Sequence, residues 1–267
     1  MIEFIGVTKR YGNNIAVEDI NLEIEDGEFV FLVGKSGAGK STCIKLLLKE
    51  VDADEGTVIV DDRVVTKLPK RLVPKHRRKI GIVFQDFRLL PKKTVFENVA
   101  FAMNITHKSK RKIREQVPKV LSLVGIEDKA FMFPDQLSEG EQQRVAIARA
   151  IVNDPTVLIA DEPTGNLDPE TAWGIMDLLQ KINDKGTTIV MVTHAKDIVD
   201  RMGKRVIAIE GGRIVRDSEG AYIDEEATML IDYDEDLSTD IEFRAETDDL
   251  PEEYDTDAGE WTETEEA

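Results

Sequence analysis

The amino-acid sequence predicts an α/β fold with a mostly parallel sheet, an N-terminal antiparallel β subdomain and an inserted α-helical subdomain. Apolar runs of strand length, such as FVFLVG at 29–34 and VLIAD at 157–161, alternate with stretches typical of helices, which indicates a parallel sheet covered on both faces. The segments IEFIGVTKRY and AVEDINLEIEDG instead alternate apolar and polar residues, as antiparallel strands do. A block at about 86–155 has a mostly helical pattern and interrupts the strands.

The remaining elements follow in order along the chain. The strand at 29–34 is followed by a glycine-rich loop and the apolar helix STCIKLLLKE, and then by the strands TVIVDD and IGIVFQ. After the helical block we expect a strand at 157–161, a helix at 169–184, a strand at 187–193 and a short helix. The strands RVIAIEGG and RIVRD complete the predicted domain, and the chain contains no internal repeat.

Charge is distributed unevenly over the 267 residues, whose formal net charge is −18. From Asp217 to the last residue there are 22 acidic residues and one basic residue, whereas the first 216 residues hold 31 acidic and 34 basic ones. A segment so acidic and so poor in apolar residues cannot bury enough surface to offset its ordering entropy. We therefore predict one domain at 1–216 and a disordered acidic tail at 217–267.

Hydropathy and cysteine content exclude several classes of protein. No apolar run approaches the roughly 18 residues of a membrane span, and the first residues lack the pattern of a secretory signal. The lone cysteine, Cys43, allows no internal disulfide, fits a reducing compartment and is interpreted as a helix-packing residue.

A nucleotide site is predicted at the loop after the strand at 29–34. The residues from Gly34 to Ser41 match G-x-x-x-x-G-K-[ST] between a buried strand and a helix, the context of a P-loop NTPase core. The glycines let backbone N–H groups face phosphates, Lys40 adds a charge for the outer phosphates, and the Ser41 hydroxyl can ligate Mg²⁺. The residues predicted to bind the nucleotide are Tyr11, Gly34, Lys35, Ser36, Gly37, Ala38, Gly39, Lys40, Ser41 and Thr42.

Polar residues at the ends of other apolar strands supply the partners for phosphoryl transfer. Asp161, at the end of VLIAD, can hold Mg²⁺, and Glu162 can polarise an attacking water. His194 ends TTIVMVTH and is predicted to lie near the γ-phosphate. Gln85 ends IGIVFQ, where its amide can contact both Mg²⁺ and the water, and the Tyr11 ring can stack on the adenine. We therefore expect an ATPase that uses ATP and Mg²⁺.

A second potential anion-binding site lies at LSEGEQQR, residues 137–144, which leads into the helix VAIARAIV. The free N–H groups at a helix N-terminus suit an anion, although the chain already has a phosphate loop. The phosphate loop, Gln85, LSEGEQ, LIADE, NLD at 166–168 and His194 occur in one order. Together they resemble an ABC-type ATP-binding cassette over residues 1–216.

This resemblance implies a head-to-tail homodimer in which the signature loop of each copy caps the ATP held by the other. The signature-loop residues that would act in the partner subunit are Ser138, Glu139, Gly140 and Glu141, with the Ser138 hydroxyl and the Gly140 N–H on the γ-phosphate. Asp168 would lie at the same interface. ATP would bridge the two copies, and its hydrolysis would loosen them.

Two acids depart from the usual family pattern LSGGQ. A carboxylate that faces ATP is repulsive, so we predict that Glu139 points away from the nucleotide or pairs with a basic residue such as Arg144. Alternatively, Glu139 and Glu141 serve only to complement the dipole at the helix N-terminus.

Within the family, QDFRLLPKKTVFENVAF at 85–101 closely resembles the FtsE group of bacterial cell-division ATPases. That resemblance implies an integral membrane partner resembling FtsX, control of septal peptidoglycan hydrolysis, and a location on the cytoplasmic face of the cell membrane at the division site. Alternatives are the ATPase subunit of a lipoprotein-releasing or macrolide-type exporter, a soluble non-transport cassette acting on ribosomes or DNA, and a clamp that does not hydrolyse ATP. The single phosphate loop and the lack of sustained heptads count against the soluble class.

Two stretches are basic, KLPKRLVPKHRRK at 67–79 and KSKRKIR at 108–114. They can form a solvated surface or contact anionic lipid headgroups beneath a membrane partner. Nucleic acid is the least favoured partner, because no aromatic residues are interleaved with the basic ones and no recognition motif is present.

Overall fold

Residues 1–220 of a computed structural model are described, so the predicted acidic tail lies mostly outside the described residues. The domain extends slightly beyond the predicted boundary at 216, because the last described strand, β10 (Arg213–Glu219), continues to Glu219. Asp217, the first acid of the predicted tail, accepts hydrogen bonds from Arg205 at 2.6 Å and 2.7 Å. This ion pair holds the end of the strand to its neighbour.

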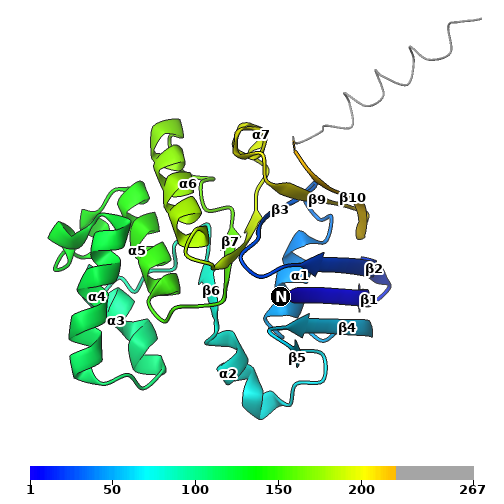
Figure 1. Ribbon diagram of the computed structural model, residues 1–267, viewed down its shortest axis with the longest axis horizontal. Helices are drawn as coiled ribbons and strands as arrows, with labels where there is room; N and C mark the ends of the chain where they lie inside the picture. Colours follow the sequence, from blue (N-terminus) through cyan, green and yellow to red (C-terminus); the bar gives the residue numbers. More distant parts are fainter. Residues whose placement is uncertain (221–267) are drawn as a thin grey trace, which may run out of the picture. The chain divides into compact units, whose positions relative to one another are not determined.

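Residues 1–220 form two sheets and a group of helices (Figure 1). The antiparallel sheet has the order β2-β1-β4-β5, and the second sheet has the order β10-β9-β3-β8-β7-β6. The other strands are β1 (Ile2–Tyr11), β2 (Asn14–Ile24), β3 (Phe29–Val33), β4 (Glu55–Val60), β5 (Arg63–Val64), β6 (Ile80–Val83), β7 (Val157–Asp161), β8 (Thr188–Val192) and β9 (Arg205–Glu210). The helices are α1 (Lys40–Leu47), α2 (Val73–Arg77), α3 (Val95–Ile105), α4 (Lys110–Val124), α5 (Glu139–Ile151), α6 (Pro169–Asn183) and α7 (Lys196–Met202), with short 3-10 helices η1 (Lys70–Leu72), η2 (Glu127–Lys129) and η3 (Pro134–Gln136).

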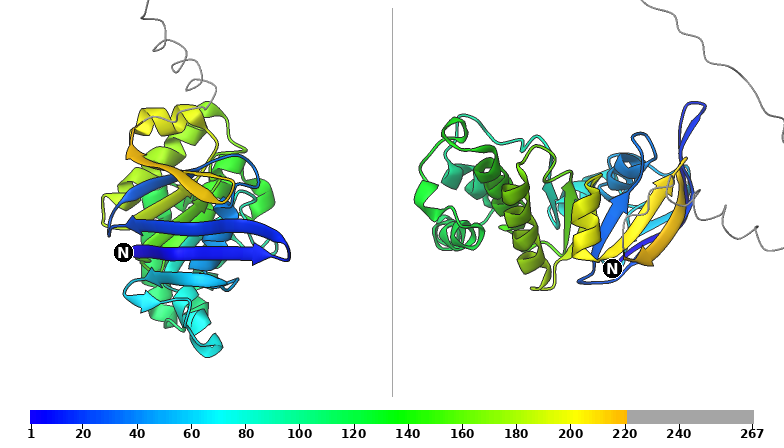
Figure 2. Two further views of the ribbon diagram at one scale, coloured as in Figure 1. Left: turned by 90° about the vertical axis from the view of Figure 1, so that its right-hand side faces the viewer. Right: turned by 90° about the horizontal axis from the view of Figure 1, so that it is seen from above.

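The second sheet is the centre of the fold. Its strands from β9 to β6 run parallel, whereas β10 pairs antiparallel with β9. Along β3 the buried side chains alternate between two cores: Phe29 and Phe31 pack with α3 to α6, whereas Val30 and Leu32 pack with α1 and the antiparallel sheet. Figure 2 shows α1 on one side of this sheet and α5 and α6 on the other. The predicted fold class is confirmed.

The antiparallel sheet forms from the first two predicted strands and β4. Ile2 of β1 lies opposite Ile24 on β2 and Val60 on β4, and all three are buried. Gly56 is needed in β4, because a Cβ at this position would lie 2.3 Å from the carbonyl oxygen of Gly6.

The basic stretch at 67–79, for which the sequence indicated no helix, folds into η1 and α2. His76 is buried, and its Nε2 lies 2.7 Å from the carbonyl oxygen of Leu47 at the end of α1. Arg77 donates through Nε to the carbonyl of Leu48 at 2.8 Å. These bonds satisfy carbonyls at the C-terminus of α1, where a cation also suits the helix dipole. Burial lowers the pKa of His76, so the neutral ring donates Nε2–H to this carbonyl.

Helices α3, α4 and α5 pack together beside the edge strand β6 (Figure 1). Local sequence sets their ends: Thr94 and Glu97 form a capping box at the start of α3, Ser109 caps α4, and Gly125 ends α4 with a φ of 74°. No helix within residues 1–220 is both long and apolar enough to span a membrane.

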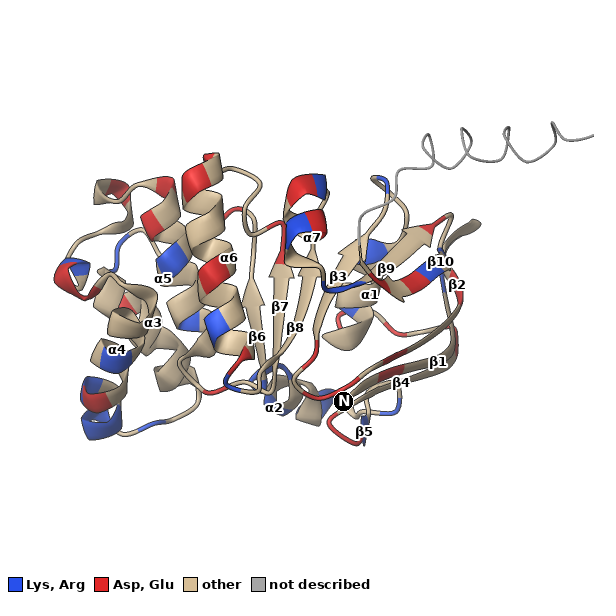
Figure 3. Ribbon diagram, turned by 45° about the horizontal axis from the view of Figure 1, so that its top comes forward, with Lys and Arg blue, Asp and Glu red and all other residues tan. Residues whose placement is uncertain are grey.

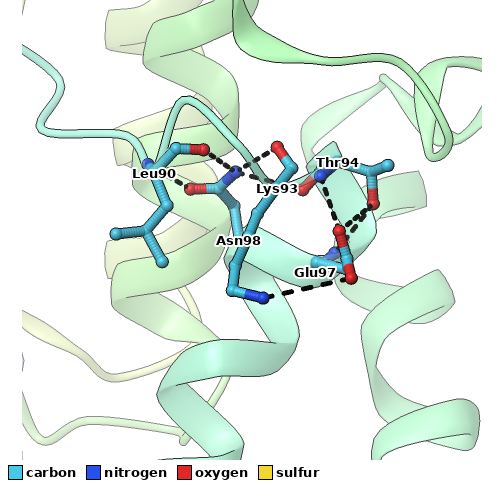
Figure 4. A network of polar contacts seen from close by, with 5 residues as sticks. All are labelled: Leu90, Lys93, Thr94, Glu97 and Asn98. Atoms are coloured by element: carbon cyan, nitrogen blue, oxygen red, sulfur yellow. Dashed lines mark hydrogen bonds and ion pairs between the residues drawn. The ribbon is translucent and has the colours of Figure 1, made fainter.

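The segment that leads into α3 is held by one buried amide. Asn98 is fully buried and accepts a hydrogen bond from the backbone N–H of Leu90 at 2.8 Å. Its Nδ2 lies 3.0 to 3.2 Å from the carbonyl oxygens of Leu90, Lys93 and Thr94 (Figure 4). One side chain therefore replaces the partners that an irregular backbone segment lacks.

Replacing Asn98 by alanine should lower the free energy of unfolding by about 2–3 kcal/mol, because several buried backbone groups lose their partner. Asn104 lies exposed on the same helix, and Asn104→Ala should change that free energy by less than about 0.5 kcal/mol. Urea denaturation of both variants measures the difference. Equal losses would show that the Asn98 amide does not hold this segment.

Candidate functional site

The predicted phosphate loop connects β3 to α1 and is shaped by two glycines. Gly34 has a φ of 142°, and a Cβ there would lie 2.2 Å from the carbonyl oxygen of Ile209. Gly39 has a φ of 119°, and its Cβ would lie 2.6 Å from the carbonyl oxygen of Ala16. The loop therefore fits between β9 and β2 only because both positions lack a side chain.

Lys40 lies across this loop. Its Nζ donates to the carbonyl oxygens of Gly34 at 2.5 Å and Lys35 at 3.0 Å. Ser41 is exposed, whereas Thr42 is buried and donates its backbone N–H to the carbonyl of Gly39. The remaining predicted loop residues, Ser36, Gly37 and Ala38, lie on the same turn, and a Cβ on Gly37 would meet nothing within 4 Å. A glycine loop with an ammonium group across it and open space above it is a cradle suited to phosphates.

The carboxyl ends of β6, β7 and β8 bring the other predicted residues to the same edge as the phosphate loop. Asp161 is the last residue of β7 and pairs with Val192, the last residue of β8. Gln85 follows β6 by two residues, and His194 follows β8 by two. In an open α/β sheet, ligands bind at this edge.

Glu162 and His194 are in direct contact. Glu162 Oε1 lies 2.8 Å from His194 Nδ1. The Glu162 side chain is 16% exposed and the His194 side chain is 71% exposed, so the carboxylate is mostly buried and the imidazole is exposed to solvent. Glu162 has a φ of 49°, a left-handed conformation that costs free energy, and its N–H donates to the carbonyl of Val192 at 2.9 Å. Because a carboxylate oxygen accepts, His194 donates Nδ1–H to Glu162, and the exposed part of the ring carries Nε2.

Gln85 lies against the loop that follows Glu162. A Cβ on Gly165 would be 3.3 Å from Gln85 Nε2, and Asn166 donates to the Gln85 carbonyl oxygen at 3.5 Å. The structure therefore brings together three of the predicted catalytic residues, Gln85, Glu162 and His194, around one loop.

The oxygens at this edge are of the kind that Mg²⁺ prefers. Desolvation raises the pKa of Asp161, and the neighbouring Glu162 raises it further, whereas Lys40 opposes the shift. A bound cation would reverse this shift. Within residues 1–220 no group of three or more His, Cys, Asp or Glu side chains forms a metal site by itself. The Ser41 hydroxyl, the Gln85 amide oxygen and the Asp161 carboxylate are oxygen ligands of the kind that Mg²⁺ takes beside phosphate oxygens.

Tyr11 is the last residue of β1 and its ring is exposed, with Lys9 Nζ 5.6 Å from the ring centroid. It lies at the hairpin to β2, the strand whose Ala16 contacts the phosphate loop. An exposed aromatic ring on this hairpin can stack on a base.

The predicted signature loop forms the start of α5. Ser138 is the N-cap and forms a capping box with Glu141: the Ser138 N–H donates to Glu141 Oε2 at 3.0 Å, and the Glu141 N–H donates to Ser138 Oγ at 3.4 Å. Lys129 forms an ion pair with the other oxygen of Glu141. The hydrogen bond from Lys129 lowers the pKa of Glu141, as does the Ser138 N–H. Glu141 is therefore engaged inside its own subunit.

Arg144, the basic residue suggested as a partner for Glu139, bonds to a different group. Arg144 donates to the carbonyl oxygen of Val124 at 2.8 Å, and the Glu139 side chain is exposed. The structure therefore shows no ion pair between Glu139 and Arg144 among the described residues, and the orientation of Glu139 away from the nucleotide stays a prediction.

The starts of α5 and α6 are packed together. A Cβ on Gly140 would lie 2.3 Å from Thr171 Cγ2, so a larger residue at this position would displace the Thr171 side chain. Asp168 is the N-cap of α6 and accepts a hydrogen bond from the Thr171 N–H at 3.0 Å. Hydrogen bonding by the Thr171 side chain, and then by its backbone, lowers the pKa of Asp168. The signature loop belongs to the helical group, apart from α1 and its phosphate loop (Figures 1 and 2).

Sequence reasoning missed two polar residues of α5 that contact the loops after Glu162 and Gln85. Gln143 is fully buried and donates to the carbonyl oxygen of Pro163, next to Glu162. Arg149 donates to the carbonyl oxygens of Phe87 and Arg88, which follow Gln85 closely. The only signal in the sequence was the presence of long polar side chains in and before the apolar stretch VAIARAIV.

Comparison with known proteins places these features in a family. Residues 17–165 match the family described as ABC transporter. The chain is 53% identical to the cell division ATP-binding protein FtsE of Streptococcus pneumoniae serotype 2 over 224 residues, which cover 83% of this chain and 97% of that protein. It is 55% identical to FtsE of Mycobacterium tuberculosis over 225 residues, which cover 83% and 98%.

A solved structure of the ATP-binding cassette MJ0796, a dimer in a post-hydrolysis state bound to ADP and Pi, is also similar. It is 37% identical, has a TM-score of 0.74, and the match covers 84% of this chain and 100% of that one. The family match spans more than half of the chain and these similarities span most of it, and the nucleotide motifs lie at one sheet edge. The chain therefore belongs to the ABC transporter family.

Proposed function

We propose that this chain is the ATP-hydrolysing subunit of a membrane ABC complex that acts in bacterial cell division, together with an integral membrane partner resembling FtsX. The observation that carries the ATPase role is the Glu162–His194 pair on the same sheet edge as the phosphate loop. The similarity to FtsE proteins over most of the chain supports the role in cell division. In this complex the chain would sit on the cytoplasmic face of the membrane at the division site and control septal peptidoglycan hydrolysis.

The residues at the sheet edge divide the work of hydrolysis. The loop glycines and Lys40 bind the phosphates, and Glu162 accepts a proton from the attacking water. His194 holds the Glu162 carboxylate through Nδ1, and Gln85 orients the water from the neighbouring loop. When bound, Mg²⁺ supplies charge neutralisation at the outer phosphate oxygens, and Ser41, Gln85 and Asp161 would hold it.

The signature loop acts on the nucleotide of a second copy. Ser138 Oγ accepts the cap bond from Glu141, so its own hydrogen is free to donate to a γ-phosphate oxygen of the sister subunit. The Gly140 N–H lies in the first turn of α5, where N–H groups have no partner within the helix. Loss of the γ-phosphate would remove these contacts and loosen the dimer. The similar MJ0796 cassette is itself dimeric.

The membrane partner docks in a groove between β6 and α3. This groove has a volume of about 390 Å³ and combines apolar side chains from Phe84, Phe101 and Ile105 with basic ones from Arg77, Arg78 and Arg88. Figure 3 shows further Lys and Arg residues on α2 and at the start of α4. A cytoplasmic segment with apolar and acidic side chains fits the groove, and the basic segments 67–79 and 108–114 would contact anionic lipid headgroups beside it.

Replacing Glu162 by glutamine should lower turnover about 10²- to 10⁴-fold, because the base is lost while the geometry is kept. The same variant should accumulate the ATP-bound dimer, which a crosslink between Ser36→Cys of one copy and Ser138→Cys of the other detects. The native Cys43 does not interfere, because it is buried and burial raises its pKa to about 12.

Glu23→Gln, at an exposed position of β2, is the control and should leave turnover unchanged. Unaltered turnover in Glu162→Gln would exclude Glu162 as the base. The lack of any crosslink with ATP would contradict the head-to-tail dimer.

Replacing Phe101 by glutamate should weaken recovery of the membrane subunit at least about tenfold, because a charge enters the apolar part of the groove. Val215→Glu, at an exposed position of β10, is the matched control. Pull-down in detergent measures how much membrane subunit each variant recovers. A separate ATP-binding measurement should give the same affinity for both variants. Recovery of a large permease instead of an FtsX-like protein would favour the exporter alternative.

A further inference from the structure

Helix α5 carries two side chains that reach the loops of its own catalytic site. Gln143 is fully buried, and its Nε2 donates to the carbonyl oxygen of Pro163 at 2.7 Å. Pro163 directly follows Glu162, so this bond fixes the peptide unit next to the proposed base. Gln143 Oε1 is buried without a hydrogen-bond partner among the described residues. A polar group retained in a buried site at this cost calls for an explanation beyond packing.

Arg149 holds the turn that follows Gln85. Its two terminal nitrogens donate to the carbonyl oxygens of Arg88 at 2.6 Å and Phe87 at 2.8 Å. Phe87 and Arg88 have φ values of 55° and 47°, two consecutive left-handed residues that are not glycine. Such a strained pair persists only where the surroundings hold it, and the planar guanidinium fork fixes two successive peptide units at once.

The turn itself is tight and faces the groove. The Phe87 N–H donates to the Phe84 carbonyl at 3.3 Å and the Arg88 N–H to the Asp86 carbonyl at 2.5 Å. The Arg88 guanidinium lies 3.9 Å from the centroid of the Phe84 ring. Gln85 is the second residue of the turn that this Phe87–Phe84 hydrogen bond closes. Arg149 holds the end of the same turn, so the position of Gln85 depends on the hydrogen bonds from Arg149.

Both contacts come from one rigid element. Gln143 and Arg149 are six residues apart, which corresponds to about 9 Å along a helix, and Ser138 caps the same helix about 7.5 Å before Gln143. α5 packs against α3, α4, α6 and β6, so its position is fixed by both the neighbouring helices and the edge of the central sheet.

We propose that Gln143 and Arg149 are positioning residues that tie the two catalytic loops of a subunit to its signature loop. A subunit whose Ser138 is engaged on the nucleotide of its sister then has its own Glu162 and Gln85 held in place. This inference rests on the proposed head-to-tail dimer.

The test compares Arg149→Met with Arg149→Lys and with Arg144→Met in the complex with the membrane subunit. Arg144 is the matched control, because it lies on the same helix and also donates to a backbone carbonyl, that of Val124 at the end of α4, which belongs to neither loop. Arg149→Met should lower kcat about 10- to 100-fold while the Kd for ATP changes less than about twofold. Arg149→Lys, which keeps the charge and one bond, should restore part of the loss. Gln143→Met should show the same split between kcat and Kd.

Amide hydrogen exchange gives a readout that does not depend on activity. Arg149→Met should speed exchange of the Phe87 and Arg88 N–H groups, and Arg144→Met should not. The inference is overturned if Arg149→Met lowers kcat no more than Arg144→Met, if the Kd for ATP changes as much as kcat, or if exchange in the turn is unaltered. If the Ser36→Cys and Ser138→Cys pair, with Gln143 and Arg149 unchanged, forms no crosslink with ATP, the head-to-tail dimer itself is overturned. The exchange rates report only on the turn within one subunit, so the two failures can be told apart.

Discussion

The site depends on the parallel pairing of β3, β8, β7 and β6, because parallel strands end at the same edge of a sheet. This pairing brings the phosphate loop, Asp161, Gln85 and His194 together from distant parts of the chain. The register continues one residue past β7, where the Glu162 N–H donates to the carbonyl of Val192. That bond holds Glu162 in a left-handed conformation and directs its carboxylate to His194. Glu162, the proposed base, is thus placed by backbone pairing and held by one side chain.

The departure of the signature loop from LSGGQ has a local explanation. Glu141 takes the position of the usual glutamine, where it closes a capping box with Ser138 and pairs with Lys129. Both contacts turn its charge toward its own subunit, and an acid in the first turn suits the helix dipole. The Gly140 position is restricted by contact with Thr171 rather than by phosphate chemistry alone. The loop therefore keeps its shape with Glu141 in place of the usual glutamine.

Helix α5 connects the parts of the proposed mechanism. Its first turn would meet the nucleotide of the sister subunit, its middle contacts the loop of Glu162, and its end holds the turn after Gln85. Arg88 and Arg149 also line the groove proposed for the membrane subunit. A partner that alters this groove would act on the same turn that positions Gln85, so partner binding and hydrolysis would be linked through few side chains.

The order and type of most elements, the phosphate loop and the strand-tip residues follow from the sequence by itself, because apolar periodicity and glycine spacing are properties of neighbouring residues. The helix at 73–77 did not follow, because His76 and Arg77 gain their partners only at the end of α1. The role of Glu141 depends on its contact with Lys129. Gln143 bonds to a carbonyl 20 residues away in the sequence, and Arg149 bonds to two carbonyls that are 61 and 62 residues away. Packing decides whether a polar side chain is solvated or is buried against a backbone carbonyl. Only the tertiary structure therefore showed that this face of α5 holds the loops after Glu162 and Gln85 and is not simply exposed to solvent.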